Sequence, residues 1–103
     1  MSGAVTREAV HEMWRELVEP AGWSVCASEF RAGLGVAGIV REGIGLVLVL
    51  NNSTLSVLDA ATYPDGEPLI VTAVADTKVW GNEGLHERLE IAATAVRLAR
   101  EGN

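Results

Sequence analysis

The sequence has one cysteine, few basic residues and no long apolar run, and each scarcity excludes a class of protein. Cys26 is the only cysteine in 103 residues, so the chain can form neither an intrachain disulfide nor a cysteine-based zinc site. Eight basic residues stand against fourteen acidic ones, for a formal charge of −6. Because the basic residues are scattered, we expect no binding to nucleic acid or to an anionic membrane surface.

Targeting and catalytic signals are also scarce. The stretch from Met1 to Glu8 has no basic region followed by an apolar one, which predicts a cytoplasmic protein without a signal peptide. No apolar run reaches the length of a membrane span. Gly33–Gly38 matches the pattern G-x-G-x-x-G, but a phosphate site requires a helix to begin there, and strand-like residues follow instead. His11 and His86 have no ligand spacing, so we predict no metal, no cofactor and no catalytic residues.

Two stretches have the periodicity of amphipathic helices. In residues 5–18, apolar side chains recur every three or four positions, and Pro20 with Gly22 ends the helix. In residues 83–100, leucine, alanine and valine form one stripe, and Asn82 can cap the first turn. These segments predict a helix near each end of a single domain, residues 1–103.

Between the helices, the chain consists of short apolar runs separated by turn residues. Leu46–Leu50 is an unbroken string of leucine and valine, which predicts a central strand covered on both faces. The strongest turn signals are the two asparagines at 51–52 and the proline and glycine at 63–66, with weaker ones at 32–33 and 42–43. The fold class is therefore α+β: a helix, a five-stranded antiparallel β-meander and a second helix.

Closing the strands on these four turns sets a register that divides the side chains between two faces. The more apolar face collects Cys26, Phe30, Ile39, Leu46, Leu48, Leu50, Leu55, Val57, Leu69, Val71 and Ala73. The opposite face, still too apolar to be left open to water, collects Trp23, Val25, Val36, Val40, Val47, Val49, Leu58, Ile70 and Val74.

Where the helices pack decides the oligomeric state. If both cover the first face, two copies can bury their second faces against each other about a two-fold axis. We therefore expect a homodimer with contacts through Val47, Val49, Ile70 and Val74. One helix on each face would instead keep the chain monomeric. Trp80, before the second helix, is a further candidate contact for a protein partner, although a plug over the end of the core is the more common role of such a tryptophan.

One polar pair interrupts the apolar register. The register places Asp59 within the first face, and Arg41 lies in the same row across Ile44, two strand spacings or about 10 Å away. A carboxylate in such surroundings needs a partner. The pair is expected either as an ion pair at the end of the sheet or as the polar part of a ligand pocket.

These features favour a non-enzymatic protein-protein interaction module of the chaperone, adaptor or inhibitor type, acting as a homodimer on an unidentified protein partner. The alternative is a small-molecule-binding domain or a small enzyme that uses Arg41 and Asp59. Seven of the eight basic residues are arginine, and alanine, valine and glycine are abundant. This bias indicates a GC-rich genome, bacterial or phage.

Overall fold

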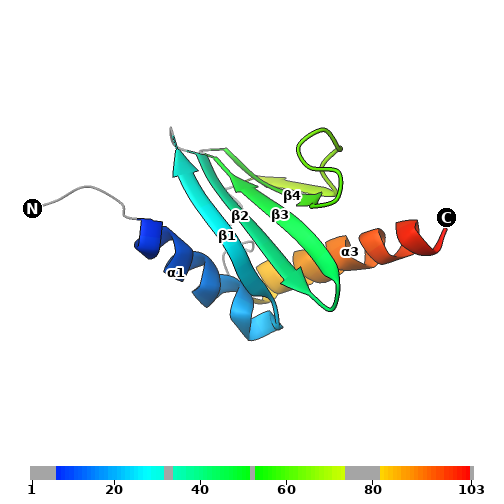
Figure 1. Cartoon of the computed structure of the whole chain (residues 1–103), viewed down its shortest axis with the longest axis horizontal. Helices are drawn as coiled ribbons and strands as arrows, with labels where there is room; N and C mark the ends of the chain where they lie inside the picture. Colours follow the sequence, from blue (N-terminus) through cyan, green and yellow to red (C-terminus); the bar gives the residue numbers. More distant parts are fainter. Residues whose placement is uncertain (1–6, 32–33, 52, 74–81, 103) are drawn as a thin grey trace, which may run out of the picture.

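The computed structural model describes residues 7–31, 34–51, 53–73 and 82–102. In chain order it contains helix α1 (Arg7–Val18), the 3-10 helix η1 (Glu19–Ala21), strands β1 (Ser24–Arg31), β2 (Leu34–Arg41), β3 (Ile44–Leu50), β4 (Thr54–Asp59) and β5 (Ile70–Ala73), and helix α3 (Asn82–Glu101). The strands form one antiparallel sheet in the order β1-β2-β3-β4-β5. The predicted α+β arrangement of helix, five-stranded meander and helix is confirmed (Figure 1).

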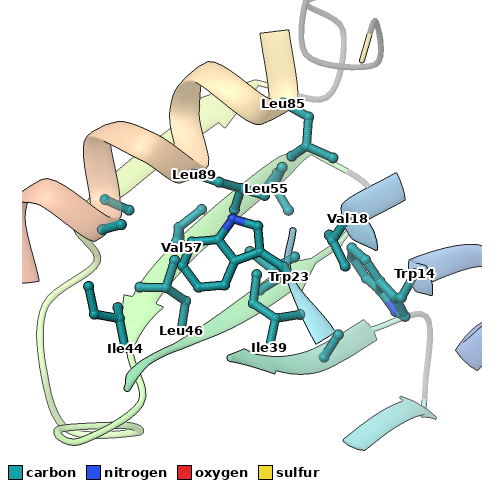
Figure 2. Packing of buried hydrophobic residues seen from close by; sticks show 14 of the residues in the cluster. Trp14, Val18, Trp23, Ile39, Ile44, Leu46, Leu55, Val57, Leu85 and Leu89 are labelled. Carbon is teal, nitrogen blue, oxygen red and sulfur yellow. The ribbon is translucent and has the colours of Figure 1, made fainter. Parts of the chain in front are cut away.

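Both helices pack on the same face of the sheet, α1 against β1 and α3 against β3 and β4 (Figure 1). On α1, the apolar residues Val10, Trp14 and Val18 recur every four positions, and all three are buried. Figure 2 shows Trp23 packed among side chains from the sheet and from α3. Burying each such large side chain contributes about 1.5–3 kcal/mol. The sheet side of this core consists of Ala37, Ile39, Ile44, Leu46, Leu48, Leu55 and Val57.

The turn between β2 and β3 has the geometry that its residues predict. Glu42 and Gly43 have φ angles of 51° and 82°, and two consecutive positive φ values match the twist of a two-residue hairpin. Ile39 therefore lies opposite Leu46, as expected. The turn between β3 and β4 is longer than expected, because the Asn51 Oδ1 atom accepts hydrogen bonds from the backbone amides of the two residues at 53 and 54, each at 2.7 Å. The pairing of β3 with β4 is therefore shifted by two residues from the predicted register. Because two is an even number, every side chain stays on its predicted face.

The predicted register of β5 is wrong. We expected Val57 to lie opposite Ala73, but it lies opposite Ile70. Strand β4 ends at Asp59, whose Oδ1 atom accepts a 2.9 Å hydrogen bond from the amide of Ala61, so the connection takes up residues 60–69 instead of a tight turn at 63–66. The register changes by three residues, an odd number, and the side chains of β5 exchange faces.

Strand β1 keeps its predicted register with β2 from Ala27 onward and departs from it only before that residue. A bulge lies between Val25 and Ala27, so that Val25 pairs with Ile39 and Cys26 is exposed instead of facing the core. Trp23, expected on the second face, is buried in the core at 1% exposure. A bulge inserts one extra residue into one strand, which changes the face that each preceding side chain occupies.

Candidate functional site

The face of the sheet opposite the helices carries apolar side chains from several strands. Counting along the paired registers, its apolar side chains come from four strands, and we call this surface the open face: Leu34, Val36, Val40, Val47, Val49, Leu58 and Val71, with the small residues Ala27, Gly38, Thr54, Ser56 and Ala73 between them. None of these residues belongs to the core cluster beneath the helices. The open face is therefore a second apolar surface of the sheet, and no described helix covers it.

The side chains of the open face lie in rows that cross the strands. The first row takes one residue from each strand and runs Glu29, Val36, Val49, Ser56, Val71. The second row runs Ala27, Gly38, Val47, Leu58. A single charged residue, Glu29 at the β1 edge, occurs in these two rows. Strand spacings of about 4.8 Å and a rise of about 3.3 Å per residue give the whole face roughly 500 Å², which is comparable to the largest apolar patches of soluble monomers.

Exposure varies across the open face. Val47 and Leu58 at its centre are 8% and 7% exposed, whereas Val71 at the β5 edge is 57% exposed. At the opposite edge, a hollow of about 220 Å³ lies over β1 and β2, where Gly38 has no side chain. The surface thus has a projecting residue at one edge and a depression at the other.

The residues predicted to contact a partner do not all lie on the same face of the sheet. Val47 and Val49 lie on the open face. Ile70 does not, since its pairing with Val57 places it on the helix-covered face, where it packs against the core. Its neighbour Val71 takes its place on the open face. Val74 and Trp80 lie outside the described residues.

The structure does not bring Arg41 and Asp59 together. The guanidinium of Arg41 donates to both carboxylate oxygens of Glu90 on α3, with Nη2 at 2.9 Å from Oε1, and to the backbone oxygen of Ala21 at 3.1 Å. It also lies over the Trp23 ring, 4.5 Å from the centroid. Asp59 lies opposite Leu46 and hydrogen-bonds within its own turn. The polar pair at this end of the sheet is therefore Arg41 with Glu90.

Hydrogen bonding sets the protonation of this pair. Donation from Arg41 lowers the pKa of the Glu90 carboxyl, and desolvation acts in the opposite direction. The same hydrogen bond raises the pKa of Arg41. Arg100 adds a second tie between α3 and this end of the sheet, donating to the backbone oxygen of Gly43 at 3.0 Å. These contacts attach α3 to the β2–β3 turn, which is a structural task.

A second hollow, of about 480 Å³, lies between α1 and the edge strand β1. Its lining includes the exposed Cys26, and His11 Nδ1 lies 3.0 Å from Ser28 Oγ across it, a hydrogen bond that joins the helix to the strand. Sequence reasoning missed this cluster, because the bulge that exposes Cys26 has no signal in the local pattern. Among the residues that the structure describes, no three His, Cys, Asp or Glu side chains are grouped closely enough to hold a metal ion.

Comparison with protein-family models, with curated proteins and with solved structures found no match. None of the helices in the described part of the chain has both the length and the apolar character that a membrane span requires. The geometry and chemistry of the open face are therefore the features from which a function can be inferred.

Proposed function

We propose that this chain is a non-enzymatic protein-interaction module, of the chaperone, adaptor or inhibitor type, that works as a homodimer through its open face. The observation that carries the proposal is the placement of α1 and α3 on one side of the sheet. Among the residues that the structure describes, that placement leaves an apolar layer of β2, β3 and β4 without a helix against it. Face-to-face contact between two sheets is the usual way to bury such a layer.

The area of the open face is sufficient for a specific contact. Two faces of roughly 500 Å² bury about 1,000 Å² in total, which reaches the lower bound of specific protein interfaces. Area alone does not determine affinity, so the contact is expected to be of moderate strength. Its centre, formed by Val47 and Leu58, carries no charge that would have to be desolvated.

The charge of the chain opposes self-association least at this face. With a formal charge of −6, two copies repel each other, and the repulsion is weakest where the apposed surfaces carry no charge. The two central rows of the open face contain one acidic residue, Glu29, at the edge. Self-association through this face keeps most acidic side chains in solvent.

Light scattering at low micromolar concentration tests the proposal. We expect the mass of a dimer for the unmodified protein and of a monomer for Val49→Asp, since a carboxylate in the buried contact would lack a partner. Val71→Asp should have the same effect and disturbs the monomer less, because Val71 is 57% exposed. The matched control is Ile91→Asp, which makes the same change at a residue 52% exposed on α3.

The control should remain a dimer. A monomeric mass for the unmodified protein up to about 100 μM, where an interface of even micromolar affinity is saturated, would refute the proposal. So would a dimer that Ile91→Asp dissociates and Val71→Asp leaves intact, because the contact would then be made by α3.

A further inference from the structure

The two edges of the sheet differ in length. Strand β1 has eight residues and β5 has four, and within the described part of the chain each pairs with a strand on one side only. After the bulge between Val25 and Ala27, β1 pairs regularly with β2 to its end, over about 16 Å. It contains neither proline nor lysine, which commonly protect an edge against an added strand. The outer side of β1 is therefore a template for an extended segment.

A hollow follows this edge. Helix α1 runs beside β1 (Figure 1), and a hollow of about 480 Å³ lies between them. On the strand side it is lined by the consecutive residues Cys26, Ala27 and Ser28. In a packed sheet, a rise of about 3.3 Å, a strand spacing of about 4.8 Å and a layer spacing of about 10 Å give roughly 160 Å³ per residue. The hollow therefore has the volume of about three residues of an added strand.

The face of β1 toward α1 offers a polar and an apolar contact two residues apart. At the hollow, His11 Nδ1 lies 3.0 Å from Ser28 Oγ, a hydrogen bond that fastens the helix beside the strand. Phe30, two residues beyond Ser28 and thus on the same face, is 53% exposed. An extended segment against β1 would place one side chain at the hollow and the side chain two residues away beside Phe30.

The charge around the hollow favours a basic segment. Glu8 and Glu12 of α1 line it, and none of the described residues that line it is lysine or arginine. Arg15 donates to Glu12 at 3.2 Å, so two carboxylates stand against one arginine, in a chain of formal charge −6. A second copy of this edge would bring like charges together, whereas a lysine or arginine would be attracted.

We propose that β1 and α1 form a groove for an extended basic segment of another protein, which adds to the sheet as a further strand beside β1. Backbone hydrogen bonds to β1 supply affinity, and side-chain contacts supply specificity: a lysine or arginine lies near Glu8, and an apolar side chain two residues away contacts Phe30. The groove is separate from the open face. The inference therefore goes beyond the proposed dimer contact and gives the interaction module a class of partner.

A synthetic peptide tests the groove. Acetylated Thr-Lys-Thr-Val-Thr-Lys-Thr-Val places lysine and valine on one face of a strand and threonine on the other. In a nuclear magnetic resonance titration to about 1 mM peptide, where even weak binding is detected, we expect shifts of the backbone amides of β1 and of the adjoining side of α1. The same peptide with glutamate in place of lysine should bind at least about threefold more weakly, the effect of one partly exposed ion pair.

N-methylation of the peptide separates strand addition from a purely electrostatic contact. Hydrogen bonding alternates along a strand, so that successive amides point to opposite edges. One peptide is methylated at both lysines and another at two threonines. One of the two should lose binding at least about tenfold, because its methyl groups remove hydrogen bonds to β1, and the other should keep it. This comparison uses the unmodified protein and needs no variant to fold.

A charge reversal locates the basic side chain. Glu8→Lys should weaken binding of the lysine peptide and strengthen binding of the glutamate peptide, each at least about threefold. Glu16→Lys is the matched control, since it makes the same change of charge at an exposed residue of α1 outside the lining of the hollow. It should change neither affinity by as much. A variant that failed to fold would bind neither peptide, so a reversed preference shows that the groove is intact.

The outcomes separate this inference from the proposed function. Equal affinity of the two methylated peptides, shifts centred on β5 or on the open face, or no shift at the highest peptide concentration would overturn the groove. Shifts of the β1 amides on dilution of the protein alone would assign this edge to a second copy and overturn the basic partner. Val49→Asp should dissociate the dimer and leave peptide binding unchanged. An unmodified protein that is monomeric and binds the lysine peptide at β1 would refute the dimer and leave the groove standing.

Discussion

Replacing Arg41 by alanine should destabilise the fold more than any other removal of a single charged side chain described above. The Arg41 side chain is 21% exposed and joins three parts of the molecule. It donates to Glu90 on α3 and to the backbone oxygen of Ala21, and it stacks on Trp23. Removing it would leave a carbonyl unpaired and free one face of a core tryptophan.

The magnitude follows from these contacts. Stacking of a cation on an aromatic ring contributes about 0.5–1 kcal/mol at a partly exposed site. The hydrogen bond to the Ala21 carbonyl contributes about 1 kcal/mol. Because the Glu90 side chain is 55% exposed, solvent screening reduces the ion pair to about 0.5–1 kcal/mol. We expect Arg41→Ala to lower the free energy of unfolding by about 2–3 kcal/mol in total.

Urea unfolding at fixed protein concentration measures this change. Arg41→Lys is the control for charge, since lysine keeps the charge but cannot form the same two-pronged contact and stack; it should lose about half as much. Asp59→Ala is the control for the alternative pairing, because an ion pair between Asp59 and a buried arginine would make that change cost about 3–5 kcal/mol. With Asp59 hydrogen-bonded only within its turn, we expect less than about 1 kcal/mol. A midpoint that moves for Asp59→Ala and not for Arg41→Ala would refute the reasoning.

Two further predictions concern protonation and thiol exposure. Because Arg41 lowers the pKa of Glu90, the stability that Glu90 contributes should be present above the pKa of the unfolded carboxyl, about 4.3, and lost as the pH falls through the lower folded value. Unfolding of the unmodified protein and of Glu90→Gln from pH 7 to pH 3 checks this, and a constant difference would contradict it. Since Cys26 is exposed, a disulfide reagent should label it completely without denaturant; labelling that requires urea would place it in the core.

Short-range chemistry accounts for the parts of the fold that were predicted correctly. The spacing of Val10, Trp14 and Val18 specifies a helix with one buried stripe whatever it packs against. Glu42 and Gly43 adopt positive φ angles, so the register of β2 with β3 follows from two adjacent residues. The order of the strands follows as well, because short connections join neighbouring antiparallel strands.

The open-face side chains of β2, β3 and β4 were predicted correctly, and those of β5 were not. Val47 and Val49 are on the open face because β3 pairs as its turn specifies. Ile70 was assigned to the wrong face because β4 ends early, at Asp59. The ten residues that follow do not determine which β5 side chains face the helices. Alternation has a period of two, so any odd error at a turn exchanges the faces of the whole following strand.

What the sequence by itself determined was local: which segments are helices or strands, their order, and the register across the tightest turn. The tertiary structure decided which face of the sheet receives the helices, where β1 bulges, and which acidic residue pairs with Arg41. Glu90 lies 49 residues away from it on another element, and only the docking of α3 brings the two together. Such contacts depend on the packing of whole elements, for which neighbouring residues carry no periodic signal. The open face exists for the same reason, since the packing of α1 and α3 on one side of the sheet leaves its other side without a described helix.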